Sequence, residues 1–224
     1  MRFQDAAKDA RAVVYAGIQA DPLVGRLAGL LADATPAERW MARASMNGER
    51  TDPDVWRRMF PTVFGADAGP ADRDRAEAIL AASLDVANRG ESARAQYRGA
   101  VVEELAQQLL TRRAAGRAPV RRERRVLFDG VRAEIHPYDV TVESADRPEV
   151  FDCKWGARGI NADVLNQLDD ARSHAADEDV ALRVALVIFD ARRSCEIRLD
   201  RATARHEGTE LIAIENVGAL GGGR

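Results

Sequence analysis

An almost continuous apolar run, from Val180 to Phe189, constrains the fold of this chain more than any other feature. A run of this kind is typical of a central strand that is buried on both faces of a sheet. Together with it, segments with helix or strand patterns follow the order α-β-β-β-α-β-β-β. The expected helices span 92–115 and 162–176, and the expected strands span 120–128, 131–142, 149–155, 180–189, 195–199 and 210–217. We therefore predict an α/β fold with a mixed sheet.

The first ninety residues show a helical pattern instead, with apolar residues three or four positions apart from Phe3 onwards. Thr35-Pro36-Ala37-Glu38 is a capping box with proline at the first helical position, and Asn88-Arg89-Gly90 is typical of a helix end. Gly221-Gly222-Gly223 is typical of a frayed terminus. We divide the chain into a helical N-terminal region over 1–90, an α/β domain over 91–217 and a flexible tail over 218–224.

Composition excludes several classes of protein. Apolar residues make up 46% of the chain and charged residues 31%, which is enough for a buried core. No segment resembles a membrane span or the apolar run of a signal peptide, so we expect a cytoplasmic protein. The two cysteines, Cys153 and Cys195, are too few for a disulfide scaffold and lack the spacing of a zinc site.

The basic residues are almost all arginine: 31 of the 33 are Arg, and only Lys8 and Lys154 are lysine. A lone lysine in an apolar strand is notable, because a compact ammonium with an adjustable pKa supports chemistry that a guanidinium does not. The net charge is −3, so a nucleic-acid partner would need a local basic patch. Seven arginines between Arg112 and Arg125 provide one.

Two strand-like segments, 138–143 and 149–155, flank a turn-like stretch and predict an antiparallel hairpin. If the pairing is centred between Ala145 and Asp146, Asp139 lies opposite Asp152 with the Cβ atoms about 4.5–5.5 Å apart. Opposed like charges are destabilising unless a cation lies between them, and a divalent metal is the obvious candidate. Alternation places Lys154 on the face of Asp152, while Phe151, Cys153 and Trp155 point to the other face.

This arrangement resembles the PD-(D/E)XK nuclease superfamily. Asp139 stands for the first acid, Asp152-Cys153-Lys154 for the triplet, and the elements from Ser92 to Asp190 match the α-β-β-β-α-β core of the restriction-endonuclease-like fold. Tyr138 departs from the pattern, since the family has proline there and this chain has Pro137 one position earlier; that position is not a ligand. Residues 1–90 lie outside the resemblance.

The resemblance implies a metal-dependent phosphodiesterase that cleaves with water and without a covalent intermediate. Asp139, Asp152 and the backbone carbonyl of Cys153 would bind Mg²⁺ or Mn²⁺. Lys154 would orient the attacking water or help to deprotonate it, and would stabilise the charge of the transition state. The alternative is an exposed ion pair on a hairpin without chemistry.

Further residues follow from the same resemblance. Gly99 and Glu103 fit the family's Gly-x-x-x-Glu, and helical geometry places Glu103 beside the buried stripe and Glu104 nearly opposite, so Glu103 is the expected third acid. An ordinary boundary glutamate is the alternative. Gln167 resembles a glutamine that completes the site in some branches, or it is a polar residue flanking a packing stripe.

Arginines near this site are expected to contact the phosphates of a nucleic acid. Arg158 lies in the loop after the triplet, and the others belong to the basic patch. A solvated charged face is the alternative. The residues expected to bind nucleic acid are Arg121, Arg122, Arg124, Arg125 and Arg158.

The resemblance favours a DNA endonuclease in prokaryotic defence, restriction or repair. Two alternatives stay open: a catalytically silent module that binds nucleic acid or a protein, and an RNase of the same fold. An unregulated nuclease harms its host, so we also expect control through a homo-oligomer or a regulatory protein. The helices of 1–90 would select the substrate or dock that partner, and no membrane partner is expected.

Overall fold

The computed structural model describes residues 1–6, 10–65, 68–132 and 136–222. The chain forms two compact units: a helical unit, Ala10–Leu105, and a sheet unit, which joins Met1–Asp9 to Ala106–Arg224. The division falls inside one continuous helix, α7 (Glu91–Ala114), whereas the sequence pattern placed it at residue 90. Within the described ranges, none of the helices combines the length and apolar character needed to cross a membrane.

Proline opens most helices of the helical unit. Five successive helices begin with proline, which fits the first helical turn because its missing N–H would have no partner there. The capping box predicted at Thr35 is present, with both of its reciprocal hydrogen bonds. The helices before α7 are α1 (Ala10–Gln19), α2 (Pro22–Ala32), α3 (Pro36–Asn47), α4 (Pro53–Met59), α5 (Pro61–Phe64) and α6 (Pro70–Ala87).

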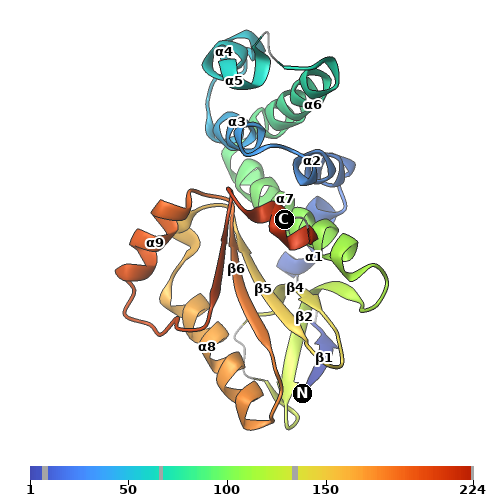
Figure 1. Ribbon diagram of the computed structural model, residues 1–224, viewed down its shortest axis with the longest axis vertical. Helices are drawn as coiled ribbons and strands as arrows, with labels where there is room; N and C mark the ends of the chain where they lie inside the picture. The colour runs from blue at the N-terminus through green and yellow to red at the C-terminus, as the bar shows by residue number, and fades with distance from the viewer. Residues whose placement is uncertain (7–9, 66–67, 133–135, 223–224) are drawn as a thin grey trace. The chain divides into compact units, whose positions relative to one another are not determined.

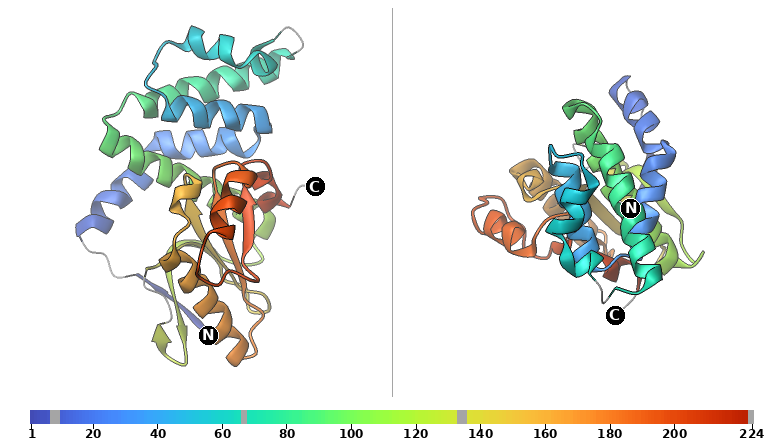
Figure 2. Two further views of the ribbon diagram at one scale, coloured as in Figure 1. Left: turned by 90° about the vertical axis from the view of Figure 1, so that its left-hand side faces the viewer. Right: turned by 90° about the horizontal axis from the view of Figure 1, so that it is seen from above.

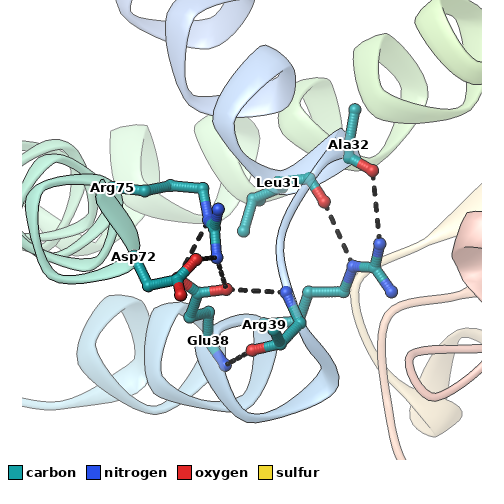
Figure 3. A network of polar contacts seen from close by, with 7 residues as sticks. Leu31, Ala32, Glu38, Arg39, Asp72 and Arg75 are labelled. Carbon is teal, nitrogen blue, oxygen red and sulfur yellow. Dashed lines mark hydrogen bonds and ion pairs between the residues drawn. The ribbon is translucent and has the colours of Figure 1, made fainter. Parts of the chain in front are cut away.

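The core of the helical unit is built around α6, which packs against α2, α3 and α4, as Figure 2 shows. A network of charged groups lies among these helices (Figure 3). Glu38 is only 3% exposed, yet it accepts hydrogen bonds from Arg75 Nε at 3.0 Å and Arg75 Nη2 at 3.2 Å. Arg39 Nε donates to the carbonyl of Leu31 at 3.1 Å. The buried charges of this unit therefore have hydrogen-bonded partners.

The sheet unit has the strand order β1-β2-β4-β5-β6-β7, with β3 paired to β2 (Figure 1). Neighbours from β1 to β5 are antiparallel, and β5, β6 and β7 are parallel. The strands are β1 (Arg2–Asp5), β2 (Val120–Phe128), β3 (Val131–Arg132), β4 (Tyr138–Val142), β5 (Glu149–Lys154), β6 (Arg183–Ile188) and β7 (Glu210–Ala213). The predicted α/β fold with a mixed sheet is confirmed, and the sheet is open.

Strand β6 is buried on both faces, as its apolar run predicts, with Val184 and Val187 at most 2% exposed. On one face it packs, together with Val150, against α8 (Ala162–Asp177) through Leu165 and Leu168. The remaining helices of this unit are η1 (Ala157–Gly159), α9 (Arg192–Asp200) and η2 (Val217–Gly221).

Several expected elements differ from the structure. Residues 2–5 form strand β1 rather than a helix, because they pair with β2 and Phe3 packs against the sheet core. The strand expected at 195–199 lies within helix α9, where Cys195 and Leu199 are four positions apart and both pack toward the core. The long strand expected at 131–142 is divided into β3 and β4; residues 133–135 lie outside the described ranges.

The expected flexible tail is also largely folded. Helix η2 covers residues 217–221, and Val217 and Leu220 are each 1% exposed. A Cβ on Gly221 would lie 3.1 Å from the side chain of Leu109, so this segment packs against the last part of α7. Burial of apolar side chains therefore fixes the segment in spite of its glycines; the last two residues lie outside the described ranges.

Candidate active site

Strands β4 and β5 form the predicted hairpin with the predicted register. The paired residues are Val140 with Phe151, Thr141 with Val150, and Val142 with Glu149. The same register, continued by one residue, sets Asp139 opposite Asp152. Asp152 lies near the carboxyl end of β5, which runs parallel to β6, and Asp139 lies near the amino end of β4.

Three side chains of the hairpin meet, and we call them the Asp139–Asp152–Lys154 cluster. Lys154 Nζ lies 3.5 Å from Asp139 Oδ2 and forms a closer ion pair with Asp152 Oδ1. The side chains are 29% exposed at Lys154, 16% at Asp139 and 8% at Asp152. The prediction that Lys154 shares a face with Asp152 is confirmed, and the ammonium is the most accessible group of the three.

Backbone contacts hold Asp139 in place. Its Oδ2 accepts a hydrogen bond from the amide N–H of Cys153 at 2.6 Å, so the middle residue of the triplet fixes the opposing carboxylate. This contact uses the amide of Cys153, and the metal-binding role of its carbonyl stays a prediction. Cys153 and Phe151 are buried on the other face, as expected. The face of Asp152 also contributes to the hydrophobic core, because Val150 lies on that face and packs against α8.

The cluster has two carboxylates for one ammonium. Burial raises the pKa of Asp152 to about 7, and the repulsion of Asp139 adds to this shift while Lys154 acts against it. For Lys154, burial alone would lower the pKa, but the charges of Asp139 and Asp152 raise it above its ordinary value. Lys154 is therefore charged at neutral pH, and its single charge does not offset the burial and repulsion that raise the pKa of Asp152.

This donor set fits a divalent cation that prefers oxygen. Asp152 Oδ1 is buried and has no hydrogen-bond partner in the described structure beyond its ion pair with Lys154. One or two carboxylates, completed by water and substrate phosphates, are the usual ligands of Mg²⁺. Within the described ranges there is no group of three or more His, Cys, Asp or Glu side chains placed to hold a metal. Asp139 and Asp152 would supply carboxylate ligands from the protein.

Glu103 belongs to the helical unit, where it is 5% exposed. Tyr15 Oη donates to its Oε1 at 2.6 Å, and Gln19 Nε2 donates to its Oε2 at 2.7 Å. Gly99 leaves room for this arrangement, since a Cβ there would lie 3.0 Å from the Tyr15 hydroxyl. The Gly-x-x-x-Glu pattern therefore places Glu103 against α1, and its role as a metal ligand stays a prediction.

Gln167 is buried on α8 and fastens that helix to the chain just before Asp139. Its Oε1 accepts a hydrogen bond from the amide of His136 at 3.1 Å, and its carbonyl accepts one from the Tyr138 hydroxyl at 3.3 Å. These contacts support the start of β4, and they do not place the Gln167 amide against the two carboxylates.

The arginines of β2 do not form one accessible patch. Arg124 has a side chain only 7% exposed and pairs with Glu143 at 2.7 Å and with Asp5, which favours an internal ion-pair role; its contact with nucleic acid stays a prediction. Consecutive strand residues point to opposite faces, and four arginines of one strand cannot all face a ligand. Arg121 and Arg158 are exposed, whereas Arg122 and Arg125 are half-buried.

Two residues near the cluster were not predicted from the sequence. Gly159 lies in η1 beside Lys154, and Asp190 follows β6 and accepts a hydrogen bond from the amide of Ala157 at 3.0 Å. The position of Asp190, directly after the buried apolar run, was a usable signal, because the carboxyl ends of parallel strands meet at one edge of a sheet. No sequence signal distinguished Gly159 from the other loop glycines.

Comparisons with known proteins add little to this geometry. No protein-family model matches the sequence, and a search of curated proteins finds no relative. Among solved structures, the crystal structure of protein VC1899 from Vibrio cholerae is similar, with 14% sequence identity and a TM-score of 0.47. The match covers 99% of this chain and 57% of that one, so this chain spans little more than half of that protein's length. This likeness shows neither a family nor an activity.

Proposed function

We propose that this protein is a metal-dependent nuclease that hydrolyses phosphodiester bonds, with DNA as its expected substrate. The observation that carries the proposal is the meeting of Asp139, Asp152 and Lys154 at the carboxyl end of β5. An isolated acid-x-Lys triplet occurs by chance, but here both acids contact the one lysine of the sheet unit's described residues, in the register predicted from the turn. The alternative of a solvated ion pair predicts an exposed carboxylate, whereas Asp152 is buried.

The order of elements supports the restriction-endonuclease-like core that the resemblance implies. From α7 the chain continues through β2, β4, β5, α8 and β6, which is the order α-β-β-β-α-β apart from the short strand β3. Strand β5 carries the triplet and lies between the antiparallel β4 and the parallel β6. The fold therefore sets the triplet at the centre of the sheet.

Each residue of the cluster has a distinct role in the proposed reaction. Asp139 and Asp152 would hold Mg²⁺ or Mn²⁺, which when bound acidifies water and neutralises charge on the phosphate. The Cys153 amide keeps Asp139 directed at the site. Lys154 orients the attacking water and stabilises developing negative charge. Its raised pKa favours this role over that of a base, because the ammonium keeps its proton.

Phosphates flanking the cleaved bond would contact exposed arginines. Arg158 belongs to η1, directly after the triplet strand, and Arg121 is exposed on β2. Both side chains would act mainly through charge, which makes binding dependent on salt. We further propose that the protein acts in the cytoplasm in defence, restriction or repair. A homo-oligomer or a regulatory protein would control it through the helices of 1–90.

A catalytically silent module is the second candidate. Glu103, the expected third acid, accepts hydrogen bonds from Tyr15 and Gln19 within the helical unit. A protein that has lost cleavage would still bind nucleic acid through its arginines. The RNase alternative shares every residue named above and differs only in substrate.

The test is cleavage of supercoiled DNA, linear DNA and RNA by the purified protein in Mg²⁺ or Mn²⁺. Chelator should abolish cutting and Lys154→Ala should reduce it by about 10²–10⁴-fold, while Lys8→Ala, which alters the chain's other lysine, should leave it unchanged. Cutting that survives chelator, or that stays at the wild-type rate in Lys154→Ala, contradicts the proposal. Metal and nucleic-acid binding without cutting of any substrate would support the silent module, and cutting of RNA alone would support the RNase.

A further inference from the structure

Gly159 lies against the aliphatic part of Lys154. A Cβ built on Gly159 would lie 2.8 Å from Cβ and Cγ of Lys154 and 3.0 Å from its Cδ. Carbon atoms that are not bonded to each other prefer about 3.5–4.0 Å, so any side chain at this position would displace the lysine or η1. The close approach of η1 to the Lys154 methylene groups therefore requires glycine.

Helix η1 is fixed in this position. Gly159 N–H donates to the Gly156 carbonyl at 2.8 Å, and the next residue, Ile160, is 1% exposed. Asp190 accepts hydrogen bonds from the amide of Ala157 at 3.0 Å and from the amide of Ala191 at 2.8 Å. Asp190 thus joins the first residue of η1 to the end of β6, so η1 cannot move away from Lys154 without breaking these bonds.

The backbone of Lys154 is also held in place. Lys154 is the last residue of β5, and its carbonyl accepts a hydrogen bond from the Phe189 amide at 2.9 Å. Four rotatable bonds would otherwise give the ammonium many positions. With the sheet holding its backbone and η1 covering its methylene groups, the side chain is directed toward Asp139 and Asp152.

We propose that Gly159 is a positioning residue for Lys154, and that Asp190 fixes η1 so that Gly159 can act. The absence of a side chain at Gly159 sets the path of the lysine and so the place of its ammonium between the two carboxylates. The effect on cleavage rests on the proposed nuclease function, whereas the effect on the position of Lys154 does not.

The first test is spectroscopic and independent of activity. Lysine labelled with ¹³C at Cε gives two signals, because the chain has two lysines, and Lys8→Arg assigns them. Gly159→Ala should shift the Lys154 signal. Gly90→Ala is the matched control, since a Cβ there meets nothing within 4 Å, and it should leave the signal in place. A folded Gly159→Ala variant with an unchanged Lys154 signal overturns the proposal.

The second test separates this inference from the nuclease proposal. Displacement of a catalytic group by about 1 Å costs about 100-fold in rate, so Gly159→Ala should lower kcat by that factor while KM stays nearly constant. If the wild-type protein cuts and Gly159→Ala cuts at the same kcat, the positioning role fails and the nuclease stands. If the wild-type protein cuts nothing, the nuclease fails and the Lys154 signal still decides the positioning role.

A third test covers the case in which Gly159→Ala does not fold. Lys154→Gly removes all three carbon atoms that a Cβ on Gly159 would meet. Gly159→Ala should therefore lower the melting temperature in the wild-type background and cause a much smaller loss in the Lys154→Gly background. Equal losses in the two backgrounds contradict the proposed contact.

Discussion

Two carboxylates of similar burial, one in each unit, have very different surroundings. Measured over the whole residue, Glu38 in the helical unit is 3% exposed and Asp152 in the sheet unit is 5% exposed. Glu38 accepts two hydrogen bonds from Arg75 and one from the amide of Thr35 at 2.6 Å. Asp152 shares the ammonium of Lys154 with a second carboxylate, Asp139. The two acids are therefore similarly buried and differ in how fully neighbouring groups compensate their charges.

The pKa shifts express the same contrast. The hydrogen bond with Glu38 raises the pKa of Arg75, which is the behaviour of a satisfied ion pair. At Asp152, burial and Asp139 raise the pKa to about 7 in spite of the neighbouring lysine. Glu38 therefore has the surroundings of a structural acid, whereas Asp152 is a carboxylate that a divalent cation would stabilise.

Loss of the Lys154 ammonium should have the largest effect on the cleavage rate. Lys154→Ala is expected to reduce cleavage by about 10²–10⁴-fold, because it removes the group that orients the water and stabilises charge. Cleavage rates under saturating substrate and metal measure the effect. Arg57→Ala, which breaks ion pairs with Glu77 and Asp54 in the helical unit, is the control and should retain the wild-type rate. Equal losses in the two variants would contradict a special role for Lys154.

Loss of Arg75, the cation that pairs with Glu38 in the helical unit, should lower the stability of the protein instead. Arg75→Ala removes the cation that forms an ion pair with buried Glu38 and is expected to lower the free energy of unfolding by about 3 kcal/mol. Urea denaturation measures it. Arg26→Ala breaks a pair whose side chains are 59% and 60% exposed, and should cost less than about 0.5 kcal/mol. A small loss at Arg75 would show that Glu38 is not a structural acid.

Neutralising Asp152 should stabilise the metal-free protein. Because its pKa is raised to about 7 when folded, the neutral form stabilises the fold below the ordinary aspartate pKa of 3.8, and this contribution is lost as pH rises through about 7. Asp152→Asn stays neutral, so at pH 8 in chelator we expect about 1–3 kcal/mol more stability than wild type. Near pH 3 the two proteins should unfold alike. Lower stability of the variant at pH 8 would contradict the raised pKa.

The smallest effect concerns the arginines. Arg158→Ala should lower the slope of log binding constant against log salt by about 0.9, as expected for one phosphate contact. Nucleic-acid titrations at several salt concentrations measure this slope, with Arg26→Ala as the control. Arg124 is paired with Glu143 and Asp5, so Arg124→Ala should lower stability without this specific change in slope. An unchanged slope for Arg158→Ala would remove Arg158 from the nucleic-acid interface.

The hairpin was predictable because its determinants are local. Alternation and the turn around Ala145 fix the register, and the register brings Asp139 and Asp152 together. The buried strand β6 and the capping box at Thr35 follow from patterns within a few residues. These features need no knowledge of distant parts of the chain.

Other features depended on distant partners. Strand β1 exists because residues 2–5 pair with β2, more than a hundred positions away, and its short sequence has no clear alternation of its own. The burial of Arg124 depends on Asp5 and Glu143, which local composition does not reveal. The contact of Gly159 with Lys154 depends on how η1 returns over the strand. Sequence therefore identified the chemical groups, and tertiary packing decided which of them are accessible.

Calorimetric titration of the chelator-treated protein with Mn²⁺ at neutral pH tests the central claim most directly. The account predicts a site on the wild-type protein that persists in Asp72→Asn, whose carboxylate is 61% exposed beside Arg75, and disappears in Asp139→Asn and Asp152→Asn. Mn²⁺ binding that is equally tight in Asp152→Asn, or no binding by the wild-type protein, would contradict it.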